Sequence, residues 1–179
     1  MLTPVSTQAE LRGWFAMARH TYAVIDSQTV PQVESMLSNA GAPEWGRLRR
    51  GGGVAQHNEA WCVQLTPDLE LSRWLIAGEE NRLEDWGVIA ASDAPFRVVR
   101  DHFRSLMEAQ LPTRERVALH WYKPQVMRAL LPLCSQMQLG EFFGPVGAFA
   151  MMQLGSWTRL QVLDAQLAAR ALGPDGAAS

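Results

Sequence analysis

The chain has 179 residues, of which 47% are hydrophobic, and carries a formal net charge of −2 with an isoelectric point near 6.1. This length suits one compact domain, or one domain with a small annex, and the composition excludes intrinsic disorder. The near-neutral charge predicts neither a nucleic-acid partner nor an anionic membrane partner, and no apolar run approaches the roughly 20 residues needed to span a bilayer.

The first part of the chain alternates short apolar runs with helical patterns. A capping box, Thr7 to Glu10, predicts a first helix, and Pro31 predicts the start of a second helix that ends near Gly41. Thr66-Pro67 and Ser92 are expected to begin two more helices. Apolar runs bounded by turn residues predict strands over 22–26, 45–50, 60–65, 86–91 and 117–122. This alternation predicts an α/β lobe with a central sheet over residues 1–123, an α+β arrangement being the alternative.

After Lys123 the pattern changes. Pro124 predicts the start of a helix that Pro132 should break, and Ser135 with Gln138 forms a second capping box. A short strand over 146–151 and a last amphipathic helix over 157–172 are expected to follow, with a frayed tail from about residue 174. Residues 124–179 are therefore predicted to form a smaller, mostly helical C-terminal lobe.

No catalytic or metal-binding motif accompanies the histidines and cysteines. None of the four histidines has HExxH or another tight ligand spacing, although a small hydrolase using His102 or His120 with a distant carboxylate stays open. Cys62 and Cys134 lie far apart and predict buried, reduced thiols. The first residues show no basic region followed by an apolar one. We therefore expect a cytoplasmic, non-enzymatic protein without a cofactor or metal.

Two groups of side chains are candidates for partner binding. Arg47 and Arg49 precede a triple glycine, Gly51 to Gly53, in a loop where arginines could pair with carboxylates of a partner. Aromatic residues are abundant near the predicted joint of the two lobes, and a lobe of about 55 residues has too little volume to bury them all. We predict that a partner segment, expected to be helical and apolar, lies in a cleft between the lobes or across its rim. Its predicted contacts are Tyr122, Arg128, Phe142, Phe143, Phe149 and Trp157, with Arg47 and Arg49 at the rim.

The stretch from Val117 to Val146 carries a series of short motifs. These are His120-Trp-Tyr-Lys-Pro124, then Val126-Met-Arg-Ala-Leu-Leu-Pro132, then Phe142-Phe-Gly-Pro-Val146. In this order they resemble the signature of the type VI secretion adaptor family, also called effector chaperones. Earlier segments agree, among them Tyr22–Asp26, Ala60-Trp61 and Trp86-Gly-Val88. The resemblance covers roughly residues 21–149.

The resemblance implies a bacterial cytoplasmic adaptor that binds one toxic effector and helps to load it onto the VgrG-type spike. It implies no catalysis. Three positions depart from the family pattern. Lys123 stands where the family usually has an acidic residue, Gln125 stands where it often has Arg, and His120 stands in place of another usual basic residue. The ion pairs usual at these positions are therefore in doubt. An immunity protein that inhibits a cognate toxin is the alternative function.

Overall fold

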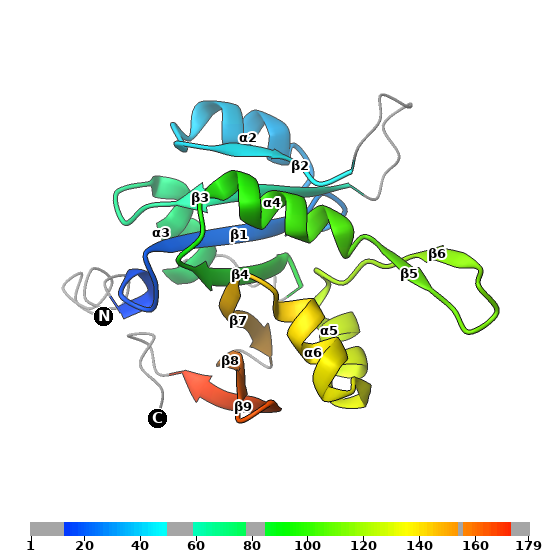
Figure 1. Ribbon diagram of the computed structural model, residues 1–179. Helices are drawn as coiled ribbons and strands as arrows, with labels where there is room; N and C mark the ends of the chain where they lie inside the picture. Colours follow the sequence, from blue (N-terminus) through cyan, green and yellow to red (C-terminus); the bar gives the residue numbers. More distant parts are fainter. Residues whose placement is uncertain (1–12, 50–58, 78–84, 154–155, 173–179) are drawn as a thin grey trace.

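The computed structural model describes residues 13–49, 59–77, 85–153 and 156–172 (Figure 1). The predicted capping box at Thr7, the triple glycine and the frayed tail lie outside these residues. The described chain forms one seven-stranded sheet in the order β2-β3-β1-β4-β7-β8-β9, and every pair of neighbouring strands is antiparallel. The fold is therefore mixed α+β, which is the alternative that the sequence left open, and not α/β.

The elements follow one another along the chain as β1 (His20–Asp26), α2 (Val33–Asn39), β2 (Trp45–Arg47), β3 (Ala60–Leu65), α3 (Glu70–Ala77), β4 (Gly87–Ser92), α4 (Phe96–Ser105), β5 (Glu108–Gln110), β6 (Arg116–Ala118), α5 (Pro124–Leu130), η1 (Leu131–Leu133), α6 (Gln136–Phe143), β7 (Val146–Gln153), β8 (Ser156–Leu163) and β9 (Gln166–Leu172).

The central strands of the large sheet, β1, β3 and β4, are buried on both faces. Alternate residues of β1 enter two separate hydrophobic clusters: Tyr22 and Val24 face α4, α5 and α6, whereas Ala23 and Ile25 pack with residues of α2 and α3. Because side chains alternate across a strand, a sheet covered on both faces needs apolar residues at every position. This is why β1 and β4 are continuous apolar runs.

Several predicted boundaries are confirmed. The strand over 60–65 is β3, and Pro124 begins α5. Pro132 lies in the 3₁₀ turn η1, where the α-helix stops. Ser135 caps α6 through both bonds of the predicted capping box, since its hydroxyl accepts from the Gln138 N–H and the Gln138 side chain accepts from the Ser135 N–H.

The predicted helical C-terminal lobe is wrong. After α6 the chain forms β7, β8 and β9, which extend the same sheet beyond β4. The expected helix over 157–172 is instead the β8–β9 hairpin, whose turn residues Asp164 and Ala165 have φ angles of 49° and 61°. Two consecutive positive φ angles match the turn that joins tightly paired strands. Residues on both sides of Lys123–Pro124 therefore share one sheet.

The predicted strand over 117–122 is also only partly correct. Residues 116–118 form β6, which pairs with β5 in a separate two-stranded hairpin, and Trp121 and Tyr122 lie in the turn before α5. This β5–β6 hairpin extends away from the body of the molecule beyond the end of α4 (Figure 1). The hairpin was not expected from the sequence.

Candidate functional site

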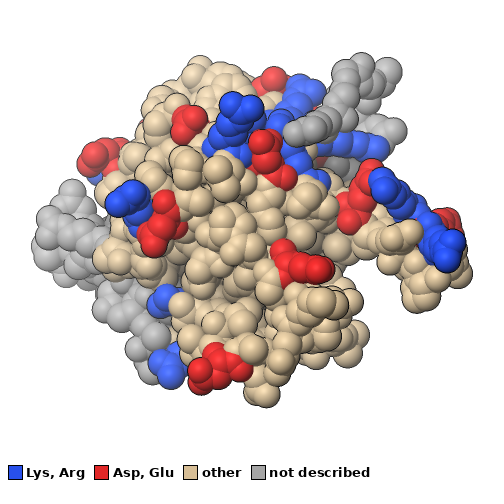
Figure 2. All heavy atoms as spheres, in the orientation of Figure 1, with Lys and Arg blue, Asp and Glu red and all other residues tan. Residues whose placement is uncertain are grey.

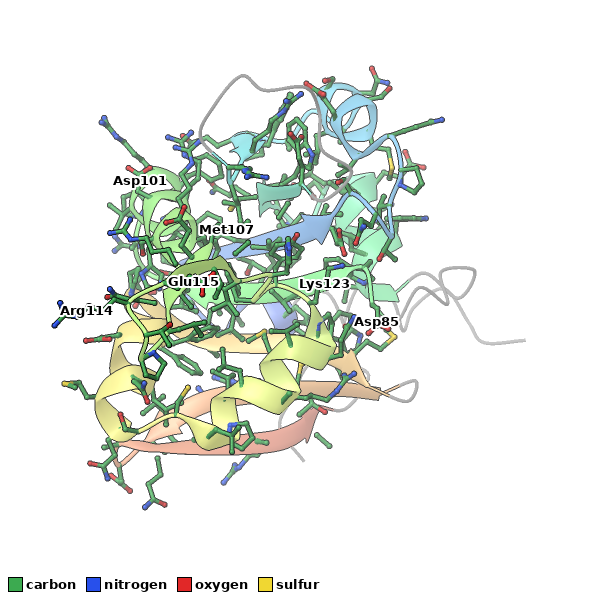
Figure 3. The ribbon with its side chains drawn as sticks, turned by 90° about the vertical axis from the view of Figure 1, so that its right-hand side faces the viewer. Asp85, Asp101, Met107, Arg114, Glu115 and Lys123 are labelled. Atoms are coloured by element: carbon green, nitrogen blue, oxygen red, sulfur yellow. The ribbon has the colours of Figure 1, made fainter. Side chains whose placement is uncertain are left out.

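A hollow of about 670 Å³ separates the β5–β6 hairpin from the body. Its walls are the C-terminal half of α4, the residues after β2 and the hairpin itself; in Figure 3, Asp101 of α4 lies above Met107 at the base of the hairpin. We call this hollow the hairpin groove. It is lined by Leu48, Arg49, Asp101, Arg104, Ser105, Met107, Glu108, Arg116, Val117, Ala118 and His120.

Arg104 fixes the wall formed by α4. Its Nε donates to the carbonyl oxygen of Leu48 at 3.1 Å, and its Nη2 donates to that of Arg47 at 2.9 Å. Its Nη1 lies 3.3 Å from a carboxylate oxygen of Asp101. The planar guanidinium can make these bonds at once, which ties the chain after β2 to α4. The groove therefore has one rigid wall.

The charges around the groove are mixed, with arginine in excess. Arg49, Arg104 and Arg116 face two carboxylates, those of Asp101 and Glu108. The Arg116 and Glu108 side chains pair at 3.6 Å, but both are exposed, so water screens this pair. Figure 2 shows Lys and Arg side chains over α4 and β2 and along the hairpin, with Asp and Glu side chains among them. Because three arginines and two carboxylates line the groove, its charge favours an acidic ligand over a basic one.

The base of the hairpin is anchored by the residues that follow it. The His120 ring nitrogen Nδ1 lies 3.0 Å from the Tyr122 hydroxyl oxygen, and Tyr122 is fully buried. Burial and the nearby Asp26 carboxylate raise the pKa of Tyr122, so its phenol stays protonated. Trp121 packs beside it, its ring 4.9 Å from that of Phe103 on α4. The hairpin thus leaves the body from a rigid aromatic base.

Lys123 has a clear structural role. Its Nζ lies 3.3 Å from Oδ2 of the buried Asp26 and donates to the side-chain carbonyl of Gln28 at 2.5 Å. Asp26 also accepts a bond from the Gln28 backbone N–H at 3.0 Å. The lysine thus joins the end of β1 to the start of α5.

Most of the predicted contact residues lie in the core. Tyr122, Phe142, Phe143, Phe149 and Trp157 are at most 9% exposed. The first four belong to the cluster beneath α4 and α6, and Trp157 packs on the opposite face against Trp14. The expectation that some would be exposed fails, because the helices and β7–β9 share one large core with the rest of the chain. Their role as partner contacts stays a prediction, and their burial argues against it.

The three predicted arginines have different positions. Arg49 is exposed and lines the hairpin groove, and Arg128 is half-buried in the last turn of α5. Arg47 is bound within the chain, at 2.9 Å from Glu34 and 3.6 Å from Glu59, with its guanidinium over the Trp61 ring. Only Arg49 of the eight predicted contacts thus lines the groove.

The histidines proposed for a hydrolase have structural partners. His102 Nε2 lies 2.9 Å from the carbonyl oxygen of Phe142, and burial lowers the pKa of His102. His120 pairs with the Tyr122 hydroxyl, as described above. Within the described residues, neither ring has a carboxylate hydrogen-bond partner, and no three His, Cys, Asp or Glu side chains gather as metal ligands. These contacts give no support to a catalytic pair.

The fold and the groove define an α+β protein with an open, mixed-charge surface beside a projecting hairpin. The chain belongs to the family described as Domain of unknown function (DUF4123), whose model matches residues 21–141. No curated protein and no solved structure gives a significant match. Within the described residues, no helix is long and apolar enough to cross a membrane.

Proposed function

We propose that this protein is a non-catalytic bacterial adaptor, acting in the cytoplasm, that binds a cognate type VI secretion effector. It then assists the loading of this effector onto the VgrG-type spike. The observation that carries the proposal is the ordered motif series from His120 to Val146, which resembles that of the effector chaperones and overlaps the matched family region.

The structural positions of these motifs support a binding role. Trp121, Phe142 and Phe149 pack against one another, with ring centroids 5.7–5.9 Å apart. This cluster supports α6 and the base of the hairpin, and so frames the hairpin groove. The motif residues would then act by holding a binding surface in shape, as packed aromatic side chains do.

The shape of the groove also favours a protein ligand. It is open and lined by both charged and apolar groups, whereas small-molecule sites are usually enclosed and mostly apolar. Protein-binding surfaces commonly combine an apolar centre with a charged rim. The half-buried Met107 and Val117 supply the apolar part here, whereas Leu48 is buried.

The proposal predicts that a toxin gene neighbours the gene for this chain, and co-expression with the product of that neighbouring toxin gene tests it. A tagged chain should retain this toxin through affinity and size-exclusion steps, an unrelated toxin should not be retained, and the bound toxin should keep its enzymatic activity. Deletion of the adaptor gene should abolish delivery of the toxin to target cells. Loss of toxin activity in the complex would instead identify an immunity protein, and absence of any complex would refute both functions.

A further inference from the structure

The free edge of β6 faces the hairpin groove. All three residues of this strand, Arg116, Val117 and Ala118, line the groove, whereas β5 contributes only Glu108. Because consecutive side chains of a strand point to opposite faces, a hollow that touches three in a row lies along the edge of the strand. In the described chain, β6 pairs with β5 alone, so its other edge has no strand beside it.

The register identifies the backbone groups at this edge. Leu119 donates to the Met107 carbonyl at 2.8 Å, and Leu111 donates to that of Glu115 at 2.9 Å. In an antiparallel pair, hydrogen-bonded and non-hydrogen-bonded residue pairs alternate. Arg116 and Ala118, opposite Gln110 and Glu108, are thus in the non-hydrogen-bonded positions. Their N–H and C=O groups point away from β5, toward the groove.

The wall opposite this edge is basic. Arg49 is exposed there, and Arg104 is held in place by two backbone carbonyls. Arg97 and Arg100, which lie nearer the start of α4, line a different hollow together with Glu44 and are not part of this wall. Asp101 is the carboxylate on this wall, and it already faces Arg104. An incoming strand would therefore meet an excess of arginine opposite its backbone contacts.

We propose that an extended segment of the client effector, carrying at least one acidic side chain, adds to β6 as a third strand. Its backbone would pair with the N–H and C=O groups of Arg116 and Ala118, and its carboxylate would approach Arg49 and Arg104. Strand addition to a free edge is a general mode of peptide recognition, in which backbone bonds give affinity and side chains give specificity. The identity of the partner rests on the proposed function; the edge and its charges do not.

A pair of proline substitutions tests the edge. Ala118→Pro removes an N–H that points into the groove, whereas Gln110→Pro removes the equivalent outward N–H at the other edge, which does not line the groove. Proline is tolerated at edge positions whose N–H is not used in the sheet. Binding to the purified product of the neighbouring toxin gene should weaken about tenfold or more for Ala118→Pro and less than about twofold for Gln110→Pro. Urea unfolding of both variants verifies that each is folded.

A charge substitution tests the opposite wall. Arg49→Glu should raise the Kd for the same toxin by about tenfold, and the loss should shrink as salt increases, because screening weakens charge pairing. The control is Arg170→Glu on β9, at the far side of the sheet, which should bind as the wild type does.

Amide hydrogen exchange separates strand addition from side-chain contact alone. In the free protein the Arg116 and Ala118 amides should exchange rapidly, and in the complex they should be protected at least about tenfold, whereas the Gln110 amide should not change. Strand addition is overturned, and the proposed function survives, if the wild type binds the toxin and two further results are obtained. Ala118→Pro and Gln110→Pro bind it equally well, and the Arg116 and Ala118 amides gain no protection in the complex. If the wild type binds no toxin, the proposed function falls with it.

Discussion

The ion pair between Lys123 and Asp26 provides a sharp test of the structure. Asp26 is 2% exposed, and its carboxylate is held by the Lys123 ammonium and by one backbone N–H of Gln28. Lys123→Met would leave a buried carboxylate with that single donor. Removing one member of a fully buried pair costs about 3–5 kcal/mol. Since the Lys123 side chain is 21% exposed, water can partly replace it, and we expect a loss of about 2 kcal/mol in the free energy of unfolding.

A double-mutant cycle isolates the interaction. Asp26→Asn, Lys123→Met and the double variant are compared by urea unfolding, followed through the fluorescence of the seven tryptophans. The double variant should lose at least about 1 kcal/mol less than the sum of the two single losses, because the second change no longer breaks a pair. Lys123→Asp should destabilise more than Lys123→Met, because it adds a second negative charge beside Asp26. A loss below about 0.5 kcal/mol for Lys123→Met, or additive losses in the cycle, would refute this account.

Three further predictions concern α6 and its contact with His102. Gly144 has a φ of 50°, and a Cβ there would overlap the His102 ring, so Gly144→Ala should cost about 3 kcal/mol in thermal or urea unfolding. Gly140→Ala, whose Cβ would meet no atom within 4 Å, should not destabilise and serves as the control. Because burial lowers the pKa of His102 below its ordinary value near 6.5, the unfolded chain binds more protons than the native one. The free energy of unfolding should therefore fall as the pH drops through about 6.5, and this fall should be shallower in His102→Gln; identical pH profiles would contradict it. Ser135→Ala removes the capping hydroxyl of α6 and should cost about 1 kcal/mol, whereas an unchanged urea midpoint would show that the cap contributes nothing.

The expectation that some of the aromatic side chains would be exposed failed for a specific physical reason. A small, independent lobe after Lys123 would have too little volume to bury all of its aromatic side chains, and some of them would be exposed. In the structure, β7 pairs with β4, so Phe142, Phe143 and Phe149 enter the same cluster as Phe103 and Trp121. A larger shared core has room for these rings.

The groove could be only partly predicted. Arg49 was a candidate because arginines precede a glycine-rich loop, and it lines the groove. The hairpin gave little signal, since β5 and β6 have three residues each and their only apolar face is the pair Ala109 and Val117. Pro112 between two short segments was the available sign of a turn. The groove depends on Arg104, which ties α4 to the carbonyl of Leu48, and on Trp121, which donates to the carbonyl of Phe103 at the base of the hairpin; both partners are distant in sequence.

Local patterns in the sequence were sufficient for the buried strands, for α5 with Pro124 at its start and for the capping box of α6. These features depend on the fixed φ of proline, on capping hydrogen bonds and on side-chain period, which act within a few residues. Only the tertiary structure decided the direction of the strands, the strand conformation of residues 157–172, the pairing of Lys123 with Asp26 and the free edge of β6. Each of these depends on which distant segments pack together, because the free energy of burial and strand pairing outweighs local preference.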